Sequence, residues 1–339
     1  MSGKVQRVRK SKWLVKVGAI VATATLLLTG CGGDTQADAG ASSSPSESVS
    51  TSATPTVQAS ALSSLDLITV TGDGQPVVDA PWPFFVEETQ VRVISEGTGS
   101  LVQAEDSVVE VDYLGINART GVTFDASWFR ANATTFSLNQ VVAGFSKAIL
   151  NQRVGARVLV AMTGADGYDP AGGNANIGVE MGDTLVFVID IRGVALDAPD
   201  GETIAPVAGL PTVDFVDGSP QVTVPAGQNA PTGLVVQPLI KGSGRAAVAS
   251  DVISVRYQIV DWNTGKVLVN TFNSDPKTGL LSNMIPGWRE GLVGQTAGSR
   301  VLMVVPPELA YPDGNQQLGI EKGATLVFVI DLLFLQVNA

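Results

Sequence analysis

The sequence contains no histidine and a single cysteine, Cys31, and each absence excludes a class of chemistry. Without histidine the chain cannot form a histidine-based catalytic triad or the common histidine metal sites. One cysteine cannot form an internal disulfide. Because Cys31 lies at the end of the apolar N-terminal segment, a thiol nucleophile in the rest of the chain is excluded as well.

Basic side chains are scarce beyond the N-terminus. Six of the 21 Lys and Arg residues precede Cys31, where no acid occurs, so the remainder carries 15 basic against 32 acidic side chains, a net charge of about −17. Nucleic acids require basic side chains to neutralise their phosphates, and anionic membrane surfaces require basic patches. The composition therefore argues against a nucleic-acid partner and against a polybasic membrane-binding patch.

The N-terminus joins a basic stretch, an apolar run over residues 17–28 and Cys31. The run is shorter than the roughly 20 residues that span a bilayer, which is typical of a secretory signal. It ends in Leu28-Thr29-Gly30-Cys31, which resembles the bacterial lipobox, where the signal is cut before a cysteine that is then lipidated. A plain signal peptide with an incidental cysteine is the alternative. We predict a lipoprotein signal peptide at 1–30 and a lipid anchor at Cys31, on the extracytoplasmic face of the cell membrane.

Residues 31–60 are mostly Ser, Thr, Ala, Pro and Gly, with few apolar side chains. Such a segment cannot bury enough apolar surface to fold, so we predict a disordered tether. The remaining chain is rich in Gly, Pro, Val and Thr, a composition that favours strands and turns over long helices.

Internal repetition organises the rest of the chain. Five segments recur in order, and their separation stays near 144 residues for Tyr113 and Tyr257 and 141 residues for Phe187 and Phe328. The first members of these pairs begin at Glu96, Val109, Val142, Val154 and Thr184, and the second members at Lys241, Ile253, Ile285, Ala297 and Thr325. We predict two copies of one domain, at 61–198 and 199–339. Each copy has a Pro-containing front segment, 65–85 and 206–231, expected to form short strands and turns.

Within each copy, alternating apolar residues predict strands, and apolar spacings of three and four predict one short helix, at 145–150 and 288–293. Strands that cover a single short helix are typical of an α+β arrangement.

The ordered motifs resemble FKBP-type peptidyl-prolyl isomerase domains, over 91–194 and again over 235–336. The resemblance implies a bent antiparallel β-sheet wrapped on a short helix, with a peptidyl proline entering an apolar cup between them. It implies no cofactor and no metal, because rotation about a peptide bond breaks no bond. The combination of a lipobox with tandem copies is similar to bacterial envelope isomerases.

The first copy keeps most of the pocket that the resemblance implies. The matching positions are Tyr113, Phe124, Asp125, Phe136, Val141, Val142, Tyr168, Val179 and Phe187, while Phe145 replaces the family's usual tryptophan at the floor of the cup. The predicted catalytic residues are Tyr113, Phe124, Asp125 and Tyr168. Asp125 is expected to act electrostatically on the twisted carbonyl and to hold Tyr113. Each aromatic alone fits ordinary core packing, and an acid alone fits a surface turn; the joint pattern favours a pocket.

The second copy departs from this pattern. It retains the pocket residues Tyr257, Ile285, Trp288, Tyr311, Ile320 and Phe328. Counting from Thr264-Gly265, however, the Phe-Asp pair becomes Leu268-Val269, and the Phe136 position falls near Gly279 or Leu280. We therefore predict a second cup without a carboxylate.

Two functions follow from the sequence. The first is a membrane-anchored prolyl isomerase at the cell envelope, which assists folding of proline-containing exported polypeptides. The second is a non-catalytic peptide-binding or chaperone lipoprotein built on the same fold. Asp125 discriminates between them, because its presence favours catalysis in the first copy.

Overall fold

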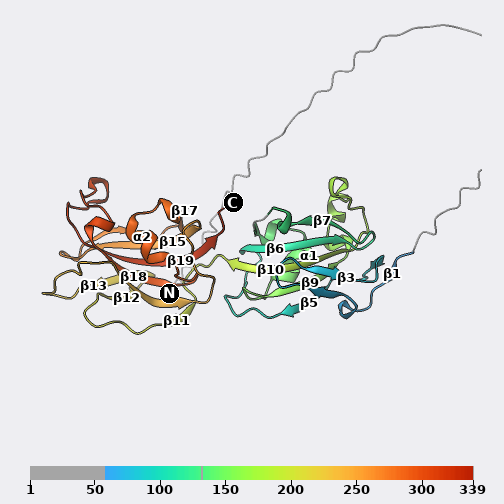
Figure 1. Cartoon of the computed structure of the whole chain (residues 1–339), viewed down its shortest axis with the longest axis horizontal. Coiled ribbons are helices and arrows are strands. Elements are labelled where there is room, and N and C mark those ends of the chain that lie inside the picture. The colour runs from blue at the N-terminus through green and yellow to red at the C-terminus, as the bar shows by residue number, and fades with distance from the viewer. Residues whose placement is uncertain (1–57, 131–132, 339) are drawn as a thin grey trace, which may run out of the picture. The chain divides into compact units, whose positions relative to one another are not determined.

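The computed structural model describes residues 58–130 and 133–338. The predicted signal peptide, Cys31 and nearly all of the predicted tether lie outside these residues. The described chain forms two large antiparallel sheets, each with one short α-helix, and three small two-stranded sheets (Figure 1). No helix in these described ranges is long and apolar enough to cross a bilayer.

The sheet of copy one has six strands around a long central pair, and all its strand pairs are antiparallel. The strand order is β5-β9-β10-β6-β7, and β8 pairs with β6 beyond the end of β7. The strands are β5 (Gln90–Ser95), β6 (Val108–Asn117), β7 (Val122–Ala126), β8 (Thr134–Ser137), β9 (Arg157–Met162) and β10 (Leu185–Val194). Helix α1 (Ala143–Ile149) lies between β8 and β9 in sequence.

Both faces of this sheet are buried, which explains why its central strands are almost continuously apolar. Val111 and Tyr113 of β6 belong to the core cluster that contains α1, whereas Leu114 and Ile116 belong to a second cluster on the other face. The front segment covers that second face. It contains β1 (Ser60–Ala61), β2 (Thr69–Thr71), β3 (Val77–Asp79) and β4 (Phe84–Phe85), so β1 begins at the last residue of the predicted tether.

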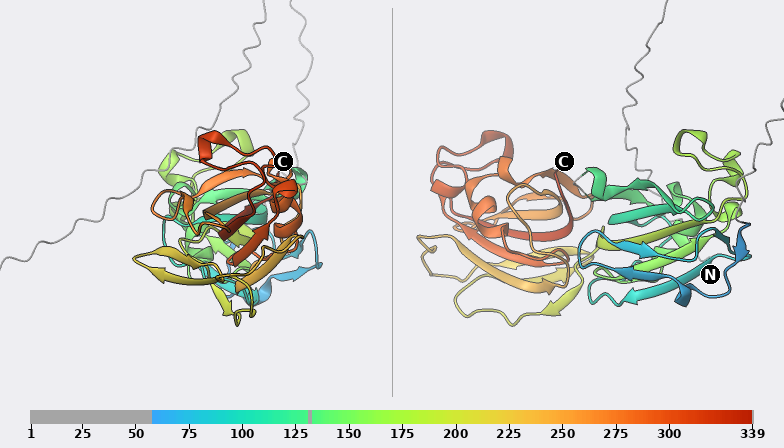
Figure 2. Two further views of the ribbon diagram at one scale, coloured as in Figure 1. Left: turned by 90° about the vertical axis from the view of Figure 1, so that its left-hand side faces the viewer. Right: turned by 45° about the vertical axis from the view of Figure 1, so that its right-hand side comes forward.

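Copy two repeats this plan. Its strand order is β11-β14-β18-β19-β15-β16, with β17 paired to β15. The strands are β11 (Gly201–Thr203), β14 (Val235–Gly242), β15 (Val252–Asp261), β16 (Val267–Asn270), β17 (Lys277–Leu280), β18 (Arg300–Val305) and β19 (Leu326–Gln336), and the helix is α2 (Pro286–Leu292). The hairpin β12 (Thr212–Val216) and β13 (Ser219–Thr223) supplies Val213 and Val222 to the cluster on the outer face. In Figure 2 the front segments, blue in copy one and yellow in copy two, lie along one face of each sheet.

Short 3-10 helices form many of the connections. They are η1 (Leu65–Leu67), η2 (Ser127–Arg130), η3 (Leu138–Gln140), η4 (Gly164–Asp166), η5 (Asp169–Ala171), η6 (Ala175–Ile177), η7 (Leu281–Asn283), η8 (Pro307–Leu309) and η9 (Gln316–Leu318).

The predicted α+β class, with two tandem copies of an antiparallel sheet against a short helix, is confirmed. The helix bounds were wrong by two residues at the start, because α1 begins at Ala143 and α2 at Pro286. Val142 and Ile285 are the N-caps, with extended backbone angles. Proline at the first helical position is favourable, since that residue's N–H has no partner inside the helix.

Candidate active site

The structure gathers the predicted pocket residues of copy one on one face of the sheet. Tyr113, Phe145, Val179 and Phe187 are buried in the core cluster, and Phe124, Phe136, Val141, Val142 and Tyr168 pack against it while remaining partly exposed. We call this cluster the cup, with the first group as its buried base and the second as its partly exposed wall. Asp125 joins the wall through a hydrogen bond from Tyr113.

Phe145 forms the floor of this cup, and the residue is 4% exposed. It meets Tyr113 edge-on at a centroid distance of 5.9 Å and an interplanar angle of 89°, and Phe187 at 5.4 Å and 88°. Phe136 lies 5.8 Å from the same ring at 79°. Edge-to-face contacts of this kind stabilise aromatic clusters beyond the burial of their area. The smaller aromatic at the floor is therefore held by three neighbouring rings.

A glycine on β6 makes room for two of the aromatic rings. Phe124 and Phe187 cross above Gly115 at a centroid distance of 5.5 Å and an angle of 90°. A Cβ atom on Gly115 would lie 2.7 Å from Phe187 Cε1 and 2.9 Å from Phe124 Cζ. Such contacts are far below van der Waals distance, so this pair of rings requires glycine at position 115.

Asp125 lies in a network of three polar side chains at the rim. The Tyr113 hydroxyl donates to Asp125 Oδ2 at 2.6 Å, and Arg130 Nη1 donates to Asp125 Oδ1 at 2.8 Å. Arg130 Nη2 also donates to the Tyr113 oxygen at 2.5 Å, and its guanidinium lies 5.6 Å from the Tyr113 ring centroid. Arg130 was not among the residues predicted from the sequence. A cation five residues after the key acid, with Ser274 at the corresponding place in copy two, was the available signal.

The ionisation of this network follows from its hydrogen bonds. Burial alone would raise the pKa of Asp125, but hydrogen bonds from Tyr113 and Arg130 outweigh burial and hold that pKa below its ordinary value of 3.8. Burial, together with the hydrogen bond to the carboxylate, raises the pKa of Tyr113 to about 12. At neutral pH the cup therefore presents an ionised carboxylate beside a protonated phenol.

Two hydrogen-bond donors of the cup have no partner within the described residues. The Tyr168 hydroxyl makes no hydrogen bond there. The pKa of Tyr168 is raised, mainly by burial and to a smaller extent by the nearby Asp125 carboxylate. The Val142 N–H, at the cap of α1, is likewise without a partner in the described chain. Both donors are therefore available to a bound carbonyl.

Copy two keeps an aromatic cup around Trp288. Its ring lies 5.2 Å from Tyr257 at 87° and 5.8 Å from Phe328 at 81°. Ile320 is buried in the same cluster, and Ile285 and Tyr311 pack against it. All six predicted pocket residues of copy two are therefore brought together.

The wall of the second cup is rebuilt with aliphatic side chains. Strand register places Ile259 and Leu268 where copy one has Gly115 and Phe124, so a larger strand residue accompanies the loss of a ring. The Phe136 position is Gly279, not Leu280, because Gly279 pairs with Ile253 as Phe136 pairs with Val109.

A methionine occupies the space that a side chain at position 279 would need. A Cβ atom on Gly279 would collide with Met284 Cε, so Met284 lies where the Phe136 side chain begins in copy one. The charged positions change as well, since Val269 stands in place of Asp125 and Ser274 in place of Arg130. The second cup has kept its aromatic base and lost its carboxylate and guanidinium.

Comparison with known proteins agrees with this geometry. The family model for FKBP-type peptidyl-prolyl cis-trans isomerase matches residues 100–192 and 243–333. A probable FK506-binding protein of Corynebacterium glutamicum is 36% identical over 116 residues, which cover 34% of this chain and 96% of that protein. The isomerase FkpA of Escherichia coli is 39% identical over 105 residues, 30% of this chain and 37% of the relative.

Among solved structures, the three FKBP domains of wheat FKBP73 are similar at 16% identity and a TM-score of 0.30, covering 73% of this chain and 94% of that one. The family model covers more than half of the chain, in two separate matches that coincide with the two sheets. The protein therefore belongs to the FKBP-type peptidyl-prolyl cis-trans isomerases and carries two domains of that family in tandem.

Proposed function

We propose that copy one is the catalytic domain and that its cup twists the amide bond preceding a bound proline. Rotation about a peptide bond is opposed by a barrier of about 18–20 kcal/mol, which arises from amide resonance. The twisted amide is less charge-separated than the planar one, so a cup of aromatic and valine side chains favours it over water. The chemistry requires no nucleophile, because no covalent bond is broken.

The polar residues of the rim complete this mechanism. The Asp125 carboxylate interacts electrostatically with the substrate carbonyl while the electron distribution of the amide changes during rotation. Tyr113 and Arg130 hold this carboxylate in place. Tyr168 and the Val142 N–H hold the substrate backbone. Fixed groups aimed at the developing charge lower the barrier without reorganising during the reaction. A barrier lower by about 4 kcal/mol corresponds to roughly a thousandfold higher rate.

The observation that carries this proposal is the ion-paired carboxylate on the wall of the aromatic cup. Asp125→Val in the full chain introduces the valine that copy two carries at the corresponding position, a side chain of similar size. We expect kcat/KM on a proline tetrapeptide to fall about a hundredfold while the circular dichroism spectrum stays unchanged. Unchanged turnover in a folded variant would overturn the role given to Asp125. Asp313→Val, on an exposed side chain in copy two, is the matched control.

A second candidate function applies to copy two, which we propose binds peptide without turning it over. Its support is the retained cup around Trp288 together with Val269 at the carboxylate position. A site that binds ground and twisted states equally does not accelerate the reaction. Linked to copy one, it raises the local concentration of a long substrate. If both copies behaved in this way, the protein would be a peptide-binding chaperone.

We also propose that the protein acts at the cell envelope, anchored through a lipid on Cys31, with exported polypeptides as its substrates. The support is the lipobox-like Leu28-Thr29-Gly30-Cys31 and the Ser- and Thr-rich segment that follows it. The acidic composition beyond Cys31 leaves no polybasic patch to provide membrane binding instead.

A further inference from the structure

The central strand of copy one has a gap in its pairing directly at the catalytic tyrosine. On the outer edge of β6, β8 pairs with residues 108–111 and β7 pairs with residues 114–117. Neither strand reaches Asp112 or Tyr113, because the chain between β7 and β8 turns away as η2. A buried backbone N–H without a partner costs about 1–3 kcal/mol, so the gap must be filled by another group.

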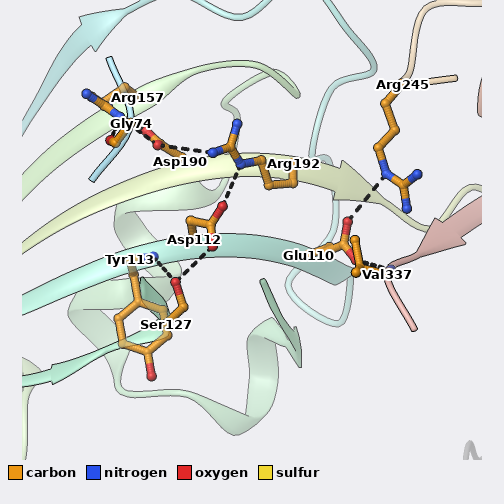
Figure 3. Close-up of polar contacts among 10 residues, drawn as sticks. All are labelled: Gly74, Glu110, Asp112, Tyr113, Ser127, Arg157, Asp190, Arg192, Arg245 and Val337. Carbon is orange, nitrogen blue, oxygen red and sulfur yellow. Dashed lines mark hydrogen bonds and ion pairs between the residues drawn. The ribbon is translucent and has the colours of Figure 1, made fainter. Parts of the chain in front are cut away.

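The Ser127 side chain fills that gap. Ser127 is fully buried, and its hydroxyl oxygen accepts the Tyr113 N–H at 2.9 Å. The same hydroxyl donates its proton to Asp112 Oδ1 at 2.9 Å (Figure 3). Because a hydroxyl has one proton, donation to the carboxylate leaves its lone pairs directed at the Tyr113 N–H. Because Asp112 is a charged acceptor, it strengthens both hydrogen bonds of the Ser127 hydroxyl, the one it donates and the one it accepts.

Arg192 fixes the other side of Asp112. Its Nε donates to Asp112 Oδ2 at 2.8 Å (Figure 3). Its guanidinium lies 5.9 Å from the ring of Trp128, the residue after Ser127 in η2. One arginine therefore contacts the start of η2 by two routes. The end of η2 is Arg130, which holds Asp125 and the Tyr113 hydroxyl.

Copy two provides an internal comparison. Its central strand has the same gap, and the Thr271 hydroxyl oxygen accepts the Tyr257 N–H at 2.8 Å. There the hydroxyl proton is donated back to the Tyr257 carbonyl, because Arg256 replaces Asp112. Leu333 stands at the position of Arg192. The carboxylate behind the gap thus occurs only in the copy that has a carboxylate in its cup.

We propose that Asp112 and Ser127 are positioning residues of the isomerase site, which fix the Tyr113 backbone and the start of η2 so that Tyr113, Asp125 and Arg130 keep their geometry. The inference rests on the proposed function of copy one. Small displacements of catalytic groups carry large losses in rate, because the reacting geometry must be held within a fraction of an ångström.

The test uses the full chain and a proline tetrapeptide. For Ser127→Ala we expect kcat to fall about tenfold with KM changed less than about twofold. The substitution disturbs only the positions of Tyr113, Asp125 and Arg130 and leaves the apolar residues of the cup in place. We also expect the acid limb of the pH–rate profile to move to higher pH, because a loosened Arg130 and Tyr113 no longer hold the Asp125 carboxylate ionised. Ser127→Thr should retain both properties, as Thr271 shows that a threonine can serve the same N–H.

Thr271→Ala is the matched control. This substitution removes the hydrogen bond to the Tyr257 N–H in copy two. The thermal stability of the protein should therefore fall as in Ser127→Ala, while its turnover and the acid limb of its pH–rate profile stay unchanged. Asp112→Asn, which keeps the size of the side chain, should lower kcat about threefold and provides a second measurement if Ser127→Ala does not fold. Wild-type kcat and an unmoved acid limb in folded Ser127→Ala or Asp112→Asn would overturn the inference. If Asp125→Val also keeps full turnover, the proposed function itself fails; if only Asp125→Val is impaired, the positioning role alone fails.

Discussion

Val269 occupies in copy two the strand position that Asp125 holds in copy one. Asp125 pairs with Gly115 across β6 and β7, and Val269 pairs with Ile259 across β15 and β16 in the corresponding register. The two side chains are similar in size, so a charge has been exchanged for a methyl-bearing group without disturbing the strand pair. One chain therefore contains two cups on the same fold, one with a carboxylate at this strand position and one without it.

Restoring the acid alone should not restore activity to copy two. In a chain carrying Asp125→Val, we expect Val269→Asp to add little turnover, because Ser274 cannot hold the new carboxylate as Arg130 does. Adding Ser274→Arg should raise kcat/KM further, with a coupling free energy of about 1–2 kcal/mol between the two sites. Tetrapeptide assays on the single and double variants give this coupling. Equal activity of Val269→Asp with and without Ser274→Arg would contradict it.

The pH dependence of copy one follows from the lowered pKa of Asp125. Burial acts to raise this pKa, but the hydrogen bonds from Tyr113 and Arg130 outweigh it, so the carboxylate stays ionised down to below pH 3.8. A carboxyl group whose pKa is lower in the folded than in the unfolded protein stabilises the fold at pH values above its unfolded-state pKa. This contribution to the free energy of unfolding is lost as the pH falls through the folded-state pKa. We expect kcat/KM to be flat between about pH 5 and 8. Arg130→Met should move the acid limb of the pH–rate profile to higher pH, because the carboxylate loses one of its hydrogen bonds. An acid limb at the parent's pH would contradict the role of Arg130.

The exchange of Gly115 and Phe124 for Ile259 and Leu268 predicts a coupled effect on stability. Gly115→Ile alone should destabilise copy one by about 3 kcal/mol, because the new side chain collides with two rings. Adding Phe124→Leu, the combination present in copy two, should recover about 1 kcal/mol or more. Urea denaturation followed by circular dichroism measures both. If the losses in free energy of unfolding were additive, the two exchanges would be independent, and the prediction that Leu268 accommodates Ile259 in copy two would be wrong.

The sequence predicts the pocket better than it predicts the residues that position the pocket. Strand alternation and the internal repeat locate Tyr113, because its motif is local and occurs twice. Asp125 was located by the resemblance to the FKBP family, because copy two has Val269 in its place. Arg130 and Ser127 lie on a 3-10 turn without periodicity, and their roles depend on where β7 ends relative to β8. The choice between Gly279 and Leu280 likewise needed strand register, which spacing along the chain does not determine. The helix starts were misplaced because apolar spacing marks the buried face and not the first turn.

Lipid anchoring through Cys31 can be tested by fractionation. Cys31→Ser removes the only thiol in the chain, so no alternative cysteine can accept the lipid. We expect the variant to accumulate uncut or to appear in the soluble fraction, while the parent chain partitions into the detergent phase. Gly33→Ser, two residues beyond the cysteine, serves as the control and should partition like the parent. Processing and detergent partition of Cys31→Ser would contradict the anchor.

Copy two should bind proline peptides without isomerising them. Trp288 is 5% exposed, and within the described residues its indole N–H has no hydrogen-bond partner. The Tyr257 hydroxyl lacks the acceptor that Asp125 provides in copy one, so this hydroxyl can donate to a bound carbonyl. Burial of a proline ring in this cup is favourable by about 25 cal/mol per Å² of apolar area. Because Val269 and Ser274 replace the charged pair, binding should be insensitive to salt and to pH between about 5 and 8.

The measurement is the change in tryptophan fluorescence on adding a proline peptide to the Asp125→Val chain. Trp288→Phe, which installs the floor residue of copy one, identifies the part of the signal that comes from copy two. We expect saturable binding in the Asp125→Val chain with little turnover, and loss of the signal in the double variant. Substantial turnover that disappears with Trp288→Phe would contradict the prediction. It would mean that an apolar cup can lower the rotation barrier without a carboxylate, and that Asp125 refines this chemistry instead of creating it.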